Sequence, residues 1–143
     1  MSEKFKAIVL NQSGEQFSRE IKILDKSFFK TGDVLVKVDF SGLNYKDALI
    51  LRNGAKLVKE YPHIPGVDFS GKVIESESSD FKINDEVLVT GSRVGEIYPG
   101  GYSQLIKVKS ELLIKRPKSI SNKNAMILGT AGFTSLMCAF AIK

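Results

Sequence analysis

Short β-type segments separated by turn residues restrict the fold of this chain more than any other feature. About seven runs rich in apolar and β-branched residues precede one long apolar stretch. The turns between them carry Asn, Asp, Gly, Ser or Pro, as at Thr31–Asp33. The runs are Phe5–Leu10, Phe17–Leu24, Val34–Phe40, Val67–Ile74, Val87–Val89, Tyr102–Val108 and Leu112–Ile114. We expect an α+β domain, mostly β, built on a twisted and partly open antiparallel barrel with short helices.

The segment Leu43–Gly54 predicts a capped helix with a tyrosine at its start. Asn44 is a favourable N-cap, and Asp47, three residues later, can reach back to it as in a capping box. Gly54 stands where a left-handed C-terminal cap is expected. Tyr45 then lies in the first turn, where unpaired N–H groups and the helix dipole favour negative charge on an exposed oxygen. Tyr45 is therefore a candidate proton donor; the alternative is a half-buried aromatic that holds the helix on a sheet.

The C-terminal stretch predicts two consecutive helices. Ser121 is an N-cap for a brief helix through Leu128, and Gly129–Thr134 opens a second helix that runs to Lys143. The second helix is apolar on all sides, and such a helix needs to be buried. We therefore expect residues 1–143 to be one domain of a longer protein, whose missing part covers this helix.

The composition excludes several functional classes. Cys138 and His63 are the only residues of their kinds, which leaves no disulfide framework and no zinc site built from Cys and His. The net charge of +5 is spread along the chain without a basic run, so we expect no nucleic-acid partner. No run of about 18 consecutive apolar residues and no signal sequence occurs, so we expect a cytoplasmic protein with no membrane partner.

The loop Gly91–Gly101 is rich in glycine, but its context does not predict a phosphate cradle. Such a cradle opens a helix, whereas this loop contains Pro99 and leads into a strand. We expect it to form a mobile wall of a pocket.

The order of these motifs resembles the catalytic domain of the medium-chain dehydrogenase/reductase superfamily, which has a GroES-like fold. In particular, the chain is similar to the zinc-free, NADPH-dependent branch of quinone-oxidoreductase-like proteins and acrylyl-CoA reductases (AcuI/YhdH type). The resemblance covers essentially all 143 residues. It is carried by Leu43–Ala48, Ile64–Gly71, Phe81–Val87, Gly100–Gln104 and Gly129–Thr134.

The resemblance also implies chemistry without a metal. Zinc-containing relatives carry a Cys before the first helix and a His-Glu pair after the glycine of the next loop, where this sequence has Asn44-Tyr45 and Val67-Asp68. Asp68 begins a strand, and a carboxylate in that position usually accepts hydrogen bonds from loop amides; a catalytic role is the alternative.

For the site, the resemblance implies that Tyr45 is the catalytic residue beside the nicotinamide. It also implies that Asn44, Tyr45, Thr130 and Thr134 contact the NADPH cofactor. The NADPH-binding Rossmann domain is absent from this chain, which has no G-x-G-x-x-G after a strand, so we expect residues 1–143 alone neither to bind the cofactor tightly nor to turn over.

The implied reaction is the NADPH-dependent reduction of an activated C=C bond, with acrylyl-CoA giving propionyl-CoA, in a homodimeric full-length protein. Two alternatives stay open. One is the reduction of quinones or other electrophilic carbonyls, and the other is a self-contained GroES-like interaction module without chemistry.

Overall fold

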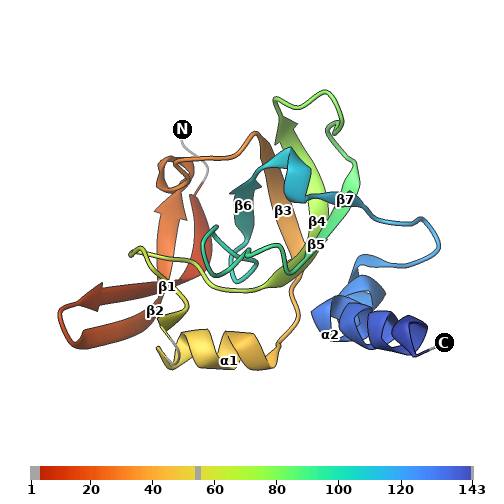
Figure 1. The fold of residues 1–143 in the computed structure, drawn as a ribbon. Helices are drawn as coiled ribbons and strands as arrows, with labels where there is room; N and C mark the ends of the chain where they lie inside the picture. Colours follow the sequence, from red (N-terminus) through yellow and green to blue (C-terminus); the bar gives the residue numbers. More distant parts are fainter. Residues whose placement is uncertain (1–3, 54–55, 143) are drawn as a thin grey trace.

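Two antiparallel sheets and two helices make up the computed structural model, which describes residues 4–53 and 56–142 (Figure 1). The strands β1 (Lys4–Ser13) and β2 (Gln16–Asp25) form a hairpin. The second sheet has the order β6-β3-β4-β5-β7. Its strands are β3 (Val34–Phe40), β4 (Asp68–Ser76), β5 (Glu86–Thr90), β6 (Leu105–Val108) and β7 (Ile114–Lys115). The helices are α1 (Tyr45–Leu51) and α2 (Asn122–Ala141), and the 3-10 turns are η1 (Lys26–Phe28) and η3 (Ser110–Leu112).

The hairpin closes one side of the barrel through loops and not through a neighbouring strand. The Ile8 amide donates to the Tyr102 carbonyl oxygen at 2.9 Å, while Leu10 and His63 exchange two backbone hydrogen bonds of 2.7 and 2.9 Å. All strand pairs among the described residues are antiparallel. The predicted mostly β fold with a partly open antiparallel barrel is therefore confirmed.

The core fills the space between the hairpin and the five-stranded sheet. Consecutive residues Val34, Leu35 and Val36 of β3 are all buried, and the pairing with β4 shifts register between Leu35 and Val36. Phe5 stacks on Phe29 with ring centroids 5.3 Å apart, which fixes the hairpin on the turn after η1.

Helix α1 starts where the capping pattern predicts. The Asn44 amide donates to Asp47 Oδ2 at 2.9 Å, and the Val67 amide donates to Asp47 Oδ1 at 3.0 Å. Asp47 therefore caps its own helix and also holds the loop before β4. Burial raises the pKa of the Asp47 carboxyl, although the donors from Asn44 and Val67 oppose that shift. The predicted cap at Gly54 lies outside the described residues.

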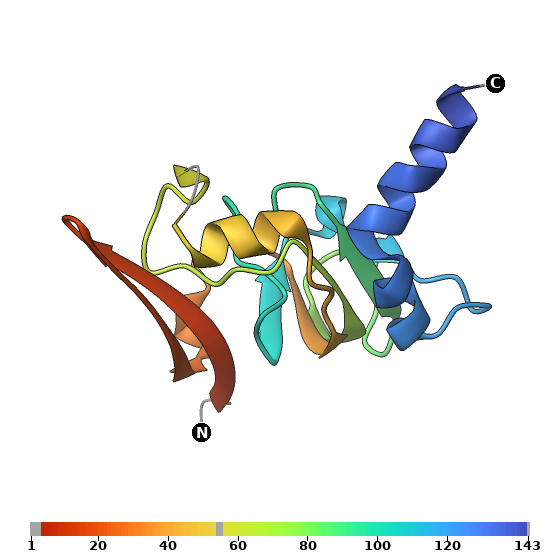
Figure 2. The ribbon, with the colours of Figure 1, turned by 90° about the horizontal axis from the view of Figure 1, so that it is seen from below.

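Helix α2 is broken near its middle. Ser121 Oγ accepts from the Asn124 amide at 3.2 Å and caps the first half, as predicted. Gly129 then has φ 48° and ψ −157°, and the second half leaves the body of the domain (Figure 2). The predicted end at Lys143 lies outside the described residues.

By length and composition alone, α2 is apolar enough to cross a membrane, and 17% of its most apolar window is buried. We expected no stretch that could cross a membrane, but the mean hydropathy of α2 is high enough for one. The window is not one straight helix, because the backbone of Gly129 is non-helical within it.

One predicted strand is largely wrong. Leu112–Ile114 was expected to be extended, but residues 110–112 form the turn η3, and β7 starts only at Ile114. The Ser110 amide and hydroxyl both bond the Asp33 carboxylate, at 2.6 and 2.7 Å, and this long-range contact overrides the local apolar pattern.

We expect His63 to make the stability of the domain depend on pH. Its imidazole is buried, with Nε2 2.9 Å from the Gly95 carbonyl oxygen, and burial lowers the pKa of His63 below 6.5. The unfolded imidazole takes up a proton below about pH 6.5 while the folded one does not. The stabilisation is therefore complete above that pH and is lost as the pH falls toward the folded pKa.

Urea unfolding at pH 7.5 and pH 5.0 checks this expectation. The loss of unfolding free energy between the two values should be smaller in His63→Gln than in the wild type, because His63 is the only histidine. An equal pH dependence in both proteins would contradict it.

Candidate functional site

The buried carboxylate of Asp68, the first residue of β4, holds three separate segments together. It is fully buried and accepts four hydrogen bonds. Oδ1 accepts from the Gly42 amide at 2.8 Å, in the loop between β3 and α1. Oδ2 accepts from Asn44 Nδ2 at 2.9 Å and from both the amide and the hydroxyl of Thr130, at 3.1 and 3.0 Å. The expectation that Asp68 binds loop amides is confirmed, and it binds two side chains as well.

Two backbone segments approach the Asp68 carboxylate so closely that each has a glycine at the contact. A Cβ atom at Gly42 would lie 2.8 Å from Asp68 Oδ1, and one at Gly129 would lie 3.0 Å from Oδ2. Gly129 also has a positive φ, which L side chains rarely adopt. The kink in α2 is therefore what lets the Thr130 amide, at the start of the second half of the helix, reach a carboxylate from the sheet.

A partly buried tyrosine bonds the loop that Asp68 holds. Tyr102 Oη donates to the Gly42 carbonyl oxygen at 3.1 Å. Burial, together with the negative charges of Asp47 and Asp68, raises the pKa of the Tyr102 hydroxyl, so it stays protonated and acts as a donor. Sequence reasoning gave no role to Tyr102; the only signal for it was its place after Gly100-Gly101 in a motif of the resemblance.

Tyr45 stands at the start of α1 with 81% of its surface exposed. The half-buried alternative is therefore wrong. Its neighbour Lys46 reaches the glycine-rich loop, where Nζ lies 2.8 Å from Oε1 of the mostly buried Glu96. The geometry leaves the Tyr45 side chain open to an incoming ligand.

The glycine-rich loop packs on the preceding proline-rich loop. The Gly100 amide donates to the Ile64 carbonyl oxygen at 2.8 Å, and the Gly101 amide donates to the Gly66 carbonyl oxygen at 2.9 Å. The start of the loop, Gly91 and Ser92, lines the cleft described next, so this part forms a pocket wall as expected. Its mobility stays a prediction.

An apolar cleft of about 630 Å³ lies between α2 and the β5–β7 edge of the sheet. Thr130 and Thr134 line it, together with apolar side chains such as Leu128, Phe133 and Leu136. Of the four predicted cofactor contacts, Thr130 and Thr134 share this cleft, and Asn44 joins Thr130 at Asp68 Oδ2. Tyr45 is not among the residues that line it.

The lining of this cleft fits one end of a dinucleotide. Apolar walls with two threonine hydroxyls suit a flat ring that carries one polar substituent, such as nicotinamide. The sequence contains no G-x-G-x-x-G turn for the phosphates. The described residues of the cleft therefore fit the nicotinamide end of NADPH.

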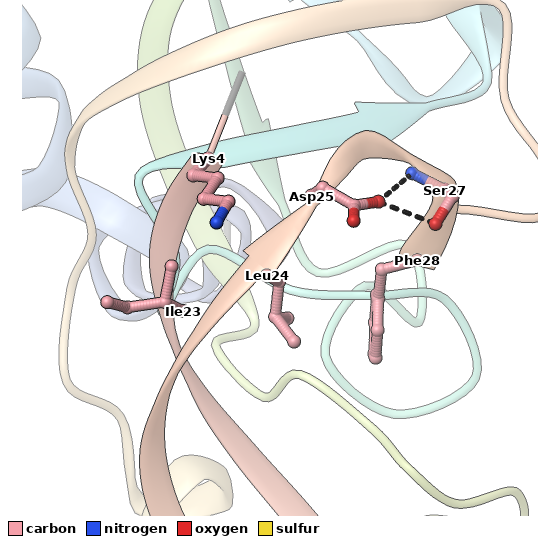
Figure 3. A pocket seen from close by; sticks show the side chains of 6 residues that line it. All are labelled: Lys4, Ile23, Leu24, Asp25, Ser27 and Phe28. Atoms are coloured by element: carbon pink, nitrogen blue, oxygen red, sulfur yellow. Dashed lines mark hydrogen bonds between the residues drawn. The ribbon is translucent and has the colours of Figure 1, made fainter. Parts of the chain in front are cut away.

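Another hollow, of about 510 Å³, lies beside the open end of the hairpin (Figure 3). Its one carboxylate, Asp25, accepts from the amide and the hydroxyl of Ser27 at 2.9 and 2.5 Å, and these bonds lower the pKa of Asp25. The carboxylate is thus used to cap η1. The lining residues are Lys4, Ile23, Leu24, Asp25, Ser27 and Phe28. We assign this hollow no part in the site.

Across the described part of the chain, no three His, Cys, Asp or Glu side chains gather where they could hold a metal ion. The zinc-free type itself stays a prediction.

Comparison with known proteins identifies the family. Residues 30–118 match the model of the alcohol dehydrogenase GroES-like domain. The chain is 39% identical over 141 residues to the acrylyl-CoA reductase AcuI of Ruegeria pomeroyi, covering 97% of this chain and 43% of that protein. It is 36% identical over 137 residues to a Bacillus subtilis protein that carries the name quinone oxidoreductase YhfP, covering 96% and 42%.

Solved structures agree with these matches. The YhdH oxidoreductase of Salmonella enterica, in complex with NADP, is 42% identical with a TM-score of 0.91, over 95% of this chain and 42% of that one. The B. subtilis YhfP structure with NAD bound is 35% identical with a TM-score of 0.93, over 98% and 43%.

The chain thus spans less than half the length of the curated relatives described above. The family model covers the five-stranded sheet, α1 and the loops around Asp68, whereas Thr130 and the rest of α2 lie beyond the residues that it matches. The chain belongs to the alcohol dehydrogenase GroES-like domain family, within the medium-chain dehydrogenase/reductase superfamily of oxidoreductases.

Proposed function

We propose that the whole protein containing this domain uses NADPH to reduce the C=C bond of a short 2-enoyl thioester, with acrylyl-CoA giving propionyl-CoA. Residues 1–143 would be its catalytic domain, and a Rossmann domain elsewhere in the protein would hold the rest of the cofactor. The observation that supports the proposal is the meeting of Asn44, the N-cap of α1, with Thr130 at Asp68 Oδ2, since Thr130 also lines the apolar cleft. The similarity to AcuI supports the substrate class.

When bound, NADPH supplies a hydride. Reduction of a conjugated alkene next needs a proton at the α-carbon, and a phenol holds a proton at neutral pH. The exposed hydroxyl of Tyr45 would give up that proton. Thr130 and Thr134 would orient the nicotinamide ring, and the apolar side chains around them would pack against it.

Quinone reduction is the second candidate, because the similar protein YhfP carries that name. The ratio of kcat/KM for acrylyl-CoA to kcat/KM for a small quinone decides between the two substrate classes. We expect that ratio to favour acrylyl-CoA.

A self-contained interaction module without chemistry is less consistent with the surface of α2. Phe133, Leu136, Met137 and Phe140 are each more than half exposed on its second half. Apolar patches of this kind mark a surface that another segment or partner covers. A stable, monodisperse 143-residue protein would instead favour the module. The cytoplasmic location and the homodimer stay predictions for the whole protein.

Replacing the Tyr45 hydroxyl tests its role. In the full-length protein that contains residues 1–143, Tyr45→Phe should lower kcat for acrylyl-CoA about 10²- to 10⁴-fold. This is the usual contribution of a positioned general acid. Its urea midpoint should stay at the wild-type value, because the side chain is 81% exposed.

Tyr61→Phe is the matched control. Its hydroxyl lies 3.3 Å from Asn53 Oδ1 and outside the cleft, so we expect wild-type turnover from this variant. Wild-type turnover in Tyr45→Phe would remove Tyr45 as the acid.

Zinc content tests the proposed metal-free chemistry. We expect the purified whole protein to contain far less than one zinc ion per chain by emission spectrometry, and 1,10-phenanthroline to leave kcat unchanged. One tightly held zinc per chain whose removal abolishes turnover would refute this part of the proposal.

A further inference from the structure

The hydroxyl protons of the two cleft threonines are already used within the chain. Thr130 Oγ1 lies 3.0 Å from Asp68 Oδ2, and Thr134 Oγ1 lies 2.8 Å from the Thr130 carbonyl oxygen. Asn44 Nδ2 and the Thr130 amide also donate to Asp68 Oδ2, so this oxygen acts as an acceptor, as a carbonyl oxygen does, and both hydroxyls donate. Since a threonine hydroxyl has a single proton, each offers only acceptor lone pairs to a ligand.

Asp68 fixes this polarity at Thr130. The Thr130 amide also donates to Oδ2, at 3.1 Å, so the residue is held by two bonds to one buried oxygen. Turning the hydroxyl proton toward the cleft would leave a buried carboxylate with one donor fewer, which is unfavourable. The hydroxyl therefore keeps its orientation when a ligand arrives.

We propose that Asp68 is a positioning residue that makes Thr130 an acceptor-only group, so that the cleft selects a ligand group carrying N–H donors. The inference rests on the proposed function, in which that group is the primary carboxamide of nicotinamide. A methyl ketone of the same shape keeps the carbonyl oxygen but sets a methyl group against the threonine lone pairs. Because the ketone lacks the N–H donor, it forms one hydrogen bond fewer with Thr130 and should bind more weakly.

Equilibrium binding of NADPH and of its reduced 3-acetylpyridine analogue tests the proposal. The full-length protein that contains residues 1–143 is used. Binding is measured in place of turnover, because the two cofactors also differ in reducing power. We expect the wild type to bind NADPH about 3- to 10-fold more tightly, as one neutral hydrogen bond would give. Thr130→Val should bring the ratio of the two Kd values close to one, and Thr130→Ser, which keeps the hydroxyl, should preserve it.

Variants of Asp68 separate hydroxyl polarity from support of the fold. Asp68→Ala frees the Thr130 hydroxyl to rotate and should lower the ratio. Asp68→Asn should keep most of the ratio of the two Kd values. Three of the four donors converge on Oδ2, and the side-chain amide oxygen of Asn can occupy the position of Oδ2. If Asp68→Ala does not fold, the two Thr130 variants decide alone.

Three results would overturn the inference. The first is a wild-type ratio near one, and the second is a ratio that Thr130→Val leaves unchanged. The third is a folded Asp68→Ala variant that weakens both cofactors equally, since that shows a merely structural role. A wild type that binds neither cofactor would overturn the proposed function and, with it, this inference.

Discussion

The interaction on which the site depends is the burial of one carboxylate. Taking a carboxyl group out of water is unfavourable unless donors replace the water, and Asp68 is fully buried. Four donors replace it, from Gly42, Asn44 and Thr130. Hydrogen bonds to a charged group contribute about 1.5–3 kcal/mol each, so the geometry around Asp68 is strongly restrained. Its neighbours Gly42 and Gly129 lack side chains that would obstruct this approach.

This restraint connects the fold to the proposed chemistry. Asn44 and Thr130 come from segments far apart in the sequence, yet both donate to Asp68 Oδ2. The start of α1, with the exposed Tyr45, is therefore held at a fixed position relative to the second half of α2. The kink at Gly129 turns that half away from the sheet and exposes its apolar side (Figure 2). A surface of this kind is what a second domain would cover in the longer protein that we propose.

Elements that depend on local signals could be predicted from the sequence. Periodicity or capping residues within a few positions predict five features: the hairpin, β3, the caps at Asn44 and Ser121, and the start of the second half of α2 after Gly129. The exposure of Tyr45 and the partners of Asp68 could not be predicted from spacing, since they depend on contacts between residues 24 to 62 positions apart. The same is true of η3, where Asp33 binds Ser110 from 77 positions away. Asp68 was expected to bind loop amides, but nothing in its neighbours indicated the Thr130 hydroxyl.

Asn44 and Thr130 donate to the same buried oxygen, and a double-mutant cycle on the free energy of unfolding tests directly whether they act together. Asn44→Ala and Thr130→Val each remove one donor to Asp68 Oδ2, and Val retains the Thr130 amide. Because each loss leaves the buried charge more dependent on the remaining donors, the double variant should lose at least about 0.5 kcal/mol more than the sum of the single losses. Losses that add to within about 0.3 kcal/mol would show that the two side chains are independent, and would contradict the account.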